Sequence, residues 1–179
     1  MKCYVFTLPL LGLMLAASPG RAETQIGTWT MNISGTVLPS TCDIDTTSQN
    51  PDVYIGEFAS NAFANVGATS ATAPLDIKLT GCSENIIGAK VTFTGTADRD
   101  NNQLLALSDT GGAGGMASGV GIEILTKDNV TIPINTQSNQ LPLNAGDNTL
   151  NFLLRYKATK IPVTAGNASS IMYFDVDYQ

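Results

Sequence analysis

The sequence predicts an all-β fold, a sandwich or a barrel of short strands, on three observations. Short segments alternate between apolar and polar residues with a period of two, as half-buried strands do. Glycine, proline, asparagine and aspartate separate these segments at the spacing expected of turns. No segment keeps the i, i+3, i+4, i+7 spacing of an amphipathic helix over a useful length.

The first alternating segment, residues 28–37, lies near the start of the chain and alternates without a break. Its length and apolar content predict a strand with one dry face that must dock against another element. The dry face consists of Trp29, Met31, Ile33, Gly35 and Val37, and the wet face of Thr28, Thr30, Asn32, Ser34 and Thr36.

Further strands are expected along the rest of the chain, each bounded by turn residues. A glycine-rich connection at residues 111–121 separates the two halves of this series. The expected strands are residues 54–58, 75–80, 90–94, 104–107, 122–125, 130–134 and 149–159.

Residues 1–22 have the features of a secretory signal peptide. Lys2 gives a positive start, residues 4–17 are mostly apolar, and Gly20 and Ala22 supply a small-residue cleavage site. The apolar run is too short for a membrane span. We therefore expect a mature chain that begins at Glu23 and forms one domain with a substantial core.

Loss of this leader also changes the charge and the cysteine count. The net charge of −6 becomes −8 when Lys2 and Arg21 leave, which argues against nucleic acid or an anionic membrane as partner. Cys3 leaves as well, so Cys42 and Cys82 remain as an even pair in an exported chain. A metal site would need further ligands, and the chain has no histidine, so a disulfide is expected.

The last segment, residues 171–179, mirrors the first. Met172, Phe174, Val176 and Tyr178 share one face, and the intervening residues share the other. Both ends of the chain are therefore expected to be amphipathic strands. The pattern alone leaves two options open: a closed sandwich, or a chain that lends one end to a neighbour.

Several short motifs together resemble a known family. Over essentially the whole mature chain, the sequence resembles pilins of the chaperone–usher pathway, the subunits of type 1-like fimbriae in Gram-negative bacteria. The matching residues are Gly35-Thr36-Val37 before Cys42, Leu79-Thr80-Gly81 before Cys82, Gly119-Val120-Gly121-Ile122, Leu150-Asn151-Phe152 with Tyr156, Ala158-Thr159, Gly166 and the penultimate Tyr178.

The resemblance implies an immunoglobulin-like sandwich that lacks its final strand and is completed by donor-strand complementation, an established case of β-strand addition. Residues 23–38 would be the N-terminal donor-strand extension and residues 39–179 the pilin domain. The donor strand would insert Trp29, Met31, Ile33, Gly35 and Val37, with Gly35 where the acceptor leaves no room for a side chain. The edge facing a chaperone or a donor would comprise Gly166, Met172, Phe174, Val176 and Tyr178.

The implied partners are a periplasmic pilus chaperone, an outer-membrane usher and neighbouring fimbrial subunits, with no cofactor. The expected function is therefore a structural subunit of a surface fimbria, exported through the periplasm, that polymerises by donor-strand exchange and supports adhesion. Two alternatives are a minor tip subunit that itself binds a glycan, and a free-standing periplasmic domain whose first strand folds back on itself.

The remaining motifs give weaker evidence of function than the family resemblance does. Residues 98–102 place oxygen ligands at alternate positions, but Gln103 stands where a calcium loop needs glycine, so a hairpin turn is expected. The glycine-rich stretch lacks the Lys-Ser/Thr pair and the helix of a phosphate loop. Without histidine the chain has no Ser-His or Cys-His machinery, and we expect no enzyme and no metal site.

Overall fold

A computed structural model describes residues 31–35 and 41–179, which fall into two units, Met1–Thr36 and Val37–Gln179. The units are described separately. In the first, residues 31–35 are exposed and belong to no helix or strand. The predicted signal peptide and the donor residues Trp29 and Val37 lie outside the described residues.

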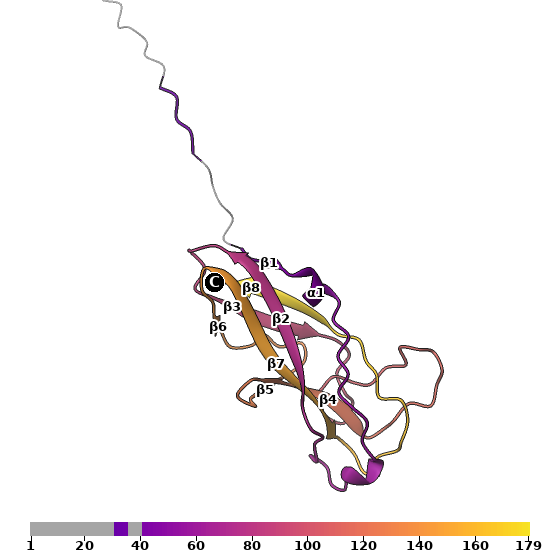
Figure 1. Cartoon of the computed structure of the whole chain (residues 1–179). Helices are drawn as coiled ribbons and strands as arrows, with labels where there is room; N and C mark the ends of the chain where they lie inside the picture. Colours follow the sequence, from indigo (N-terminus) through magenta and orange to yellow (C-terminus); the bar gives the residue numbers. More distant parts are fainter. Residues whose placement is uncertain (1–30, 36–40) are drawn as a thin grey trace, which may run out of the picture. The chain divides into compact units, whose positions relative to one another are not determined.

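The second unit contains two antiparallel sheets (Figure 1). The larger sheet has the order β1-β2-β7-β4-β5 and the smaller sheet the order β6-β3-β8. Among the described residues, no helix is long and apolar enough to cross a membrane. The larger sheet comprises β1 (Asp43–Ile44), β2 (Ala73–Cys82), β7 (Gly146–Ala158), β4 (Val120–Thr126) and β5 (Thr131–Ile132), and the smaller β6 (Leu141–Pro142), β3 (Gly88–Thr94) and β8 (Tyr173–Tyr178).

Alternation along the strands builds the core between the sheets. In β2 every second residue from Ala73 to Leu79 is buried, and Leu75 lies opposite Phe152 of β7. Phe93 of β3 meets Phe152 edge to face, with ring centroids 5.0 Å apart. Aromatic pairs prefer this geometry, which joins the two sheets through their buried faces. The predicted all-β sandwich is thus confirmed.

Two predicted strands were wrong. Residues 54–58 form no strand, because none of residues 51–58 makes a main-chain hydrogen bond with another described residue. Residues 104–107 also form none, although Leu105 exchanges two main-chain hydrogen bonds with Ile122 of β4. Two short helical turns flank residues 54–58. The first is α1 (Thr46–Gln49), where the Asp45 side chain accepts a hydrogen bond from the Thr47 N–H, and the second is η1 (Ser60–Ala62).

Candidate functional site: an apolar groove beside an unpaired strand

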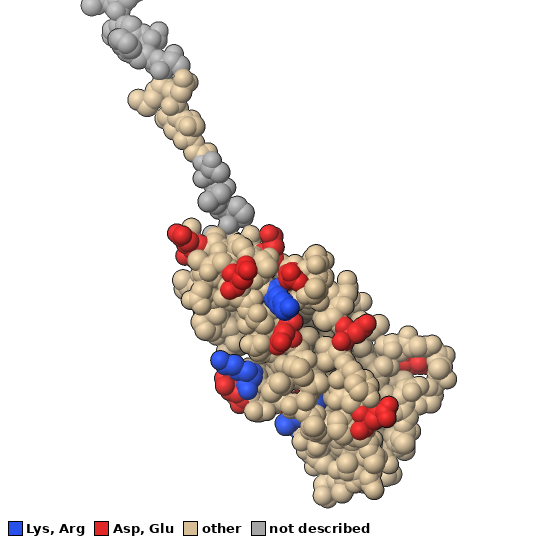
Figure 2. All heavy atoms as spheres, in the orientation of Figure 1, with Lys and Arg blue, Asp and Glu red and all other residues tan. Residues whose placement is uncertain are grey.

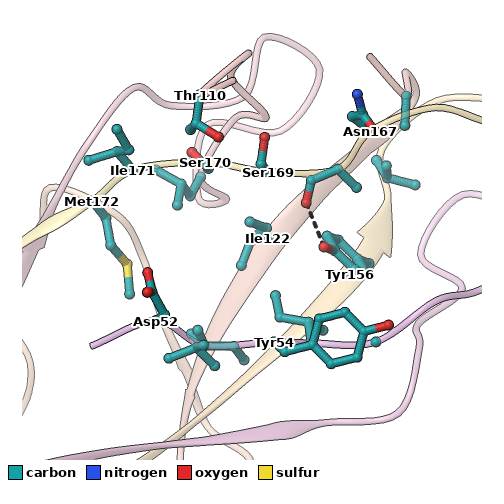
Figure 3. Close-up of a pocket in the computed structure, with 18 of the residues that line it drawn as sticks. Asp52, Tyr54, Thr110, Ile122, Tyr156, Asn167, Ser169, Ser170, Ile171 and Met172 are labelled. Carbon is teal, nitrogen blue, oxygen red and sulfur yellow. Dashed lines mark hydrogen bonds between the residues drawn. The ribbon is translucent and has the colours of Figure 1, made fainter. Parts of the chain in front are cut away.

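A groove of about 1340 Å³ opens along the second unit. One wall is formed by residues 49–58 and the opposite wall by residues 163–174, which lead into β8. Figure 3 shows Asp52 and Tyr54 on one side, Ile171 and Met172 on the other, and Ile122 and Tyr156 between them. The groove thus separates two stretches of chain that are distant in the sequence.

The floor of the groove is apolar and belongs to the core of the sandwich. It consists of side chains from the larger sheet and from the segment before β4, all of them buried or half-buried. Water in such a groove contacts hydrocarbon, so filling it with apolar side chains is favourable. The main floor residues are Leu75, Leu105, Val120, Ile122, Leu154 and Tyr156.

Both walls leave main-chain hydrogen-bonding groups without a protein partner on the groove side. Among the strands of residues 41–179, β8 pairs only with β3 and is the edge of its sheet. The facing residues 51–58 have no main-chain hydrogen bonds to other described residues. Unpaired strand edges are templates for another strand, and they otherwise promote aggregation. The groove therefore has the apolar floor and the open edges that an extended segment requires.

Hydrogen bonds to neighbouring segments hold the wall at residues 163–171 in place. The N–H of Ala117 donates to the main-chain oxygen of Asn167 at 2.9 Å, and the N–H of Ser108 donates to that of Ser169 at 2.8 Å. The phenol of Tyr156 donates to the main-chain oxygen of Ala168 (Figure 3). Burial, together with the nearby Tyr54, raises the pKa of Tyr156, so the phenol keeps its proton and remains a donor.

The structure brings part of the predicted edge together at the groove. Gly166, Met172 and Phe174 line it, whereas Val176 and Tyr178 lie further along β8, half-buried and packed against the core. The phenol of Tyr178 donates to the main-chain oxygen of Cys42 at 3.2 Å. This contact ties the far end of β8 to the beginning of the domain.

Gly166 has a steric reason to be glycine. A Cβ atom placed there would lie 2.3 Å from the main-chain oxygen of Gly115 and 2.5 Å from the main-chain nitrogen of Ala117. Real Cβ atoms essentially never approach so closely, and both neighbours are backbone. The absent side chain therefore lets the glycine-rich connection lie against this wall of the groove.

The predicted disulfide is present between Cys42 and Cys82. Among the described donor residues, Met31 and Ile33 are 80% and 86% exposed, and a Cβ atom on Gly35 would meet nothing within 4 Å.

The 98–102 segment is a turn in which the Asp98 carboxylate accepts from the N–H groups of Asp100 and Asn101. Within residues 31–35 and 41–179, no group of three or more potential ligands of the His, Cys, Asp and Glu types could hold a metal.

The wall at residues 49–58 was not identified as part of a site from the sequence. Its signal is the alternation of half-buried Val53 and Ile55 with exposed Asp52 and Tyr54. Such alternation predicts a strand, but here it marks an extended segment that pairs with no strand in the part of the chain that the structure describes. The pattern thus reports one-sided burial of this segment, although the predicted strand does not form.

Comparison with known proteins agrees with this architecture. The family model described as "Fimbrial protein" matches residues 31–179. An uncharacterised fimbrial-like protein of Escherichia coli K12, YcbU, is 45% identical over 150 residues, covering 83% of each chain. The S-fimbrial protein subunit SfaG of Escherichia coli is 38% identical over 178 residues, covering 99% of this chain and 97% of its own.

Solved structures give the same result for the fold. The P pilus rod subunit PapA has a TM-score of 0.65 at 21% identity, covering 77% of this chain and 99% of its own. A type I fimbria protein of Burkholderia pseudomallei has a TM-score of 0.55 at 35% identity, covering 79% of this chain and 88% of its own. The matched family model spans most of the chain, and the chain therefore belongs to the fimbrial protein family.

Proposed function

We propose that the chain is a structural subunit of a surface fimbria and polymerises by donor-strand exchange. The single observation that carries this proposal is the apolar groove with an unpaired β8 edge on one side and the unpaired residues 51–58 on the other. Family membership supports the same conclusion, because fimbrial subunits assemble outside the cell.

The occupant we propose is the segment of residues 23–38 from a second copy or a related subunit. Its dry face carries Trp29, Met31, Ile33 and Val37, which match the apolar floor. Burying each side chain stabilises the complex by about 1.5–3 kcal/mol before the entropy of association is subtracted. Main-chain hydrogen bonds to the open edges add about 0.5–1.5 kcal/mol each.

Before a donor arrives, the same groove requires a temporary occupant. We propose a periplasmic pilus chaperone for this role and an outer-membrane usher for the exchange. The predicted contact residues are Gly166, Met172, Phe174, Val176 and Tyr178, which lie along residues 163–174 and β8. A domain stable by only about 5–15 kcal/mol has little margin for an unfilled groove.

Deletion of residues 23–37 from the mature chain tests the proposal. We expect the deleted chain to fold and to bind its chaperone, because residues 39–179 keep the groove, but we expect no growth of fibre beyond it. Fibres that grow normally from the deleted subunit would contradict the proposal. Electron microscopy of a strain without the gene separates a major subunit, whose loss removes the fibre, from the alternative minor tip subunit, whose loss alters only the tips.

A purified mature chain that is a stable monomer with fast, reversible unfolding would favour the free-standing domain instead. A glycan array with the chaperone-held chain tests the adhesive alternative. Binding of a specific glycan there would assign this chain a receptor-binding role in addition to polymerisation.

A further inference from the structure

Exposed acidic side chains lie on β8, which continues the wall at residues 163–174, and on the opposite wall. On β8, Phe174 and Val176 are half-buried against the core, whereas Asp175 and Asp177 between and beyond them are exposed. On the opposite wall Asp52 is exposed next to half-buried Val53. Along β8 the alternation therefore places apolar side chains inward and carboxylates outward, whereas Asp52 of the opposite wall lines the groove.

Basic side chains do little to offset these carboxylates. Among the described residues that line the groove, there are three acidic residues, Asp52, Glu57 and Asp109, and no Lys or Arg. Lys90 of β3 is the cross-strand neighbour of Asp177, but the corresponding neighbour of Asp175 is Thr92. Figure 2 likewise shows more acidic than basic side chains over the face in view.

Strand pairing would bring these carboxylates next to the side chains of any strand that occupies the groove. Directly opposite residues of paired strands point to the same face of a sheet, whichever direction the strands run. A strand added to β8 would therefore place its outward side chains beside those of Tyr173, Asp175 and Asp177. Like charges in such positions are destabilising, and opposite charges are stabilising.

We infer that Asp175 and Asp177 are specificity-determining residues that select against incoming strands with acidic outward side chains. The inference rests on the proposed function and adds a rule of partner choice to it. The donor segment of this chain obeys the rule, because it carries no charge from Thr24 to Cys42. Its outward residues Thr28, Thr30, Asn32, Ser34 and Thr36 are all neutral.

Competition between donor peptides tests this selection directly. The full mature chain is refolded with an equimolar mixture of the 23–38 peptide and its Asn32→Asp variant, and mass spectrometry measures the ratio bound. Asn and Asp have nearly the same shape, so the comparison isolates charge. We expect the native peptide to be favoured about two- to fivefold for each opposed pair of like charges. An Asn32→Lys peptide should be favoured over the native one.

High salt and variants of the protein test whether the preference between peptides arises from the charges on β8. The preference should shrink in 1 M salt, where the screening length falls to about 3 Å. It should also shrink in an Asp175→Asn/Asp177→Asn protein. An Asp128→Asn protein is the matched control, because Asp128 is an exposed acid in the β4–β5 turn and does not line the groove. A second peptide pair with Thr30→Asp samples the neighbouring outward position.

The outcomes separate the two ideas. Native and acidic peptides that bind equally well would overturn the selection rule and leave the proposed function standing. A preference that persists in the Asp175→Asn/Asp177→Asn protein and in 1 M salt would also overturn it. Failure of the native 23–38 peptide to bind at all would overturn the proposed function, and the rule with it.

Discussion

The phenol of Tyr156 on β7 donates a hydrogen bond to the main-chain oxygen of Ala168, linking the floor of the groove to one of its walls. The ring also meets Phe58 of the opposite wall edge to face, with centroids 6.1 Å apart. One side chain of the larger sheet thus contacts both walls. The distance between the walls, and hence the fit of an added strand, depends on this residue.

Replacement of Tyr156 by Phe should therefore lower the free energy of unfolding of the domain modestly and weaken the binding of a strand in the groove. The ring and its contact with Phe58 remain, but the hydrogen bond to Ala168 is lost, which costs about 0.5–1.5 kcal/mol. Urea unfolding of the groove-filled chain measures the change. Tyr173→Phe is the control, because Tyr173 is 70% exposed and should tolerate loss of its hydroxyl. Equal effects of both substitutions would contradict this role for Tyr156.

Substitution of Gly166 by Ala should displace a wall of the groove. The added Cβ would overlap the backbone of Gly115 and Ala117, and overpacking of this kind costs about 1–3 kcal/mol. We expect lower stability and weaker binding of the 23–38 peptide in a titration. Gly111→Ala is the control, since a Cβ there meets nothing within 4 Å. A Gly166→Ala chain that binds the peptide normally would show that the wall adapts.

The sequence predicts β2, β3, β7 and β8 well, because each has one face on the core and alternates accordingly. It fails for residues 54–58, since periodicity reports one-sided burial and not whether another main chain lies alongside. The groove itself was expected only through the family resemblance. Its walls come from segments more than a hundred residues apart, so no local pattern contains it.

Glu123 shows a second limit of sequence patterns. It occupies the position on β4 that alternation assigns to the outer face, yet it is only 1% exposed. Its Cα neighbour across the sheet is Arg155, which with Lys157 forms ion pairs to the two carboxylate oxygens at 2.7 Å each. Thr131 of β5 donates a further hydrogen bond. This burial depends on partners from two other strands.

The cluster around Glu123 predicts acid sensitivity. Burial by itself would raise the pKa of Glu123, but hydrogen bonds from Lys157, Arg155 and Thr131 outweigh it and hold the pKa below its ordinary value of 4.5. The unfolded chain then binds more protons than the folded chain as the pH falls below about 4.5. The stability from this group is therefore present above that pH and is lost as the pH falls through the lower pKa of the folded state.

Glu123→Gln tests this prediction. The variant should lose about 1–3 kcal/mol at neutral pH, because two charge-assisted hydrogen bonds are weakened. Its stability should also fall less steeply than that of the native chain between about pH 5 and pH 3, measured by urea unfolding at each pH. Parallel pH profiles for the two chains would contradict the assignment.

Removal of the disulfide should destabilise the domain strongly. Cys42 and Cys82 close a loop with a sequence separation of 40, worth about 4 kcal/mol in the chain-entropy model. A Cys42→Ser/Cys82→Ser chain should unfold at a lower urea concentration than the native chain. Reduction of the native chain should reproduce the loss in vitro. Unchanged unfolding after complete reduction would contradict this contribution.

Steric fit of the donor strand is tested most sharply at Gly35, which the family resemblance assigns to the narrowest part of the acceptor. Gly35→Leu adds bulk to the dry face, where we expect it to slow or block insertion into the groove. Ser34→Leu is the matched control, since it adds nearly the same bulk to the wet face of the same segment. Polymerisation of each chaperone-held variant is followed by the loss of monomer with time. Growth of Gly35→Leu at the rate of Ser34→Leu would mean that Gly35 does not enter a narrow pocket, and the register of the donor strand would have to be reassigned.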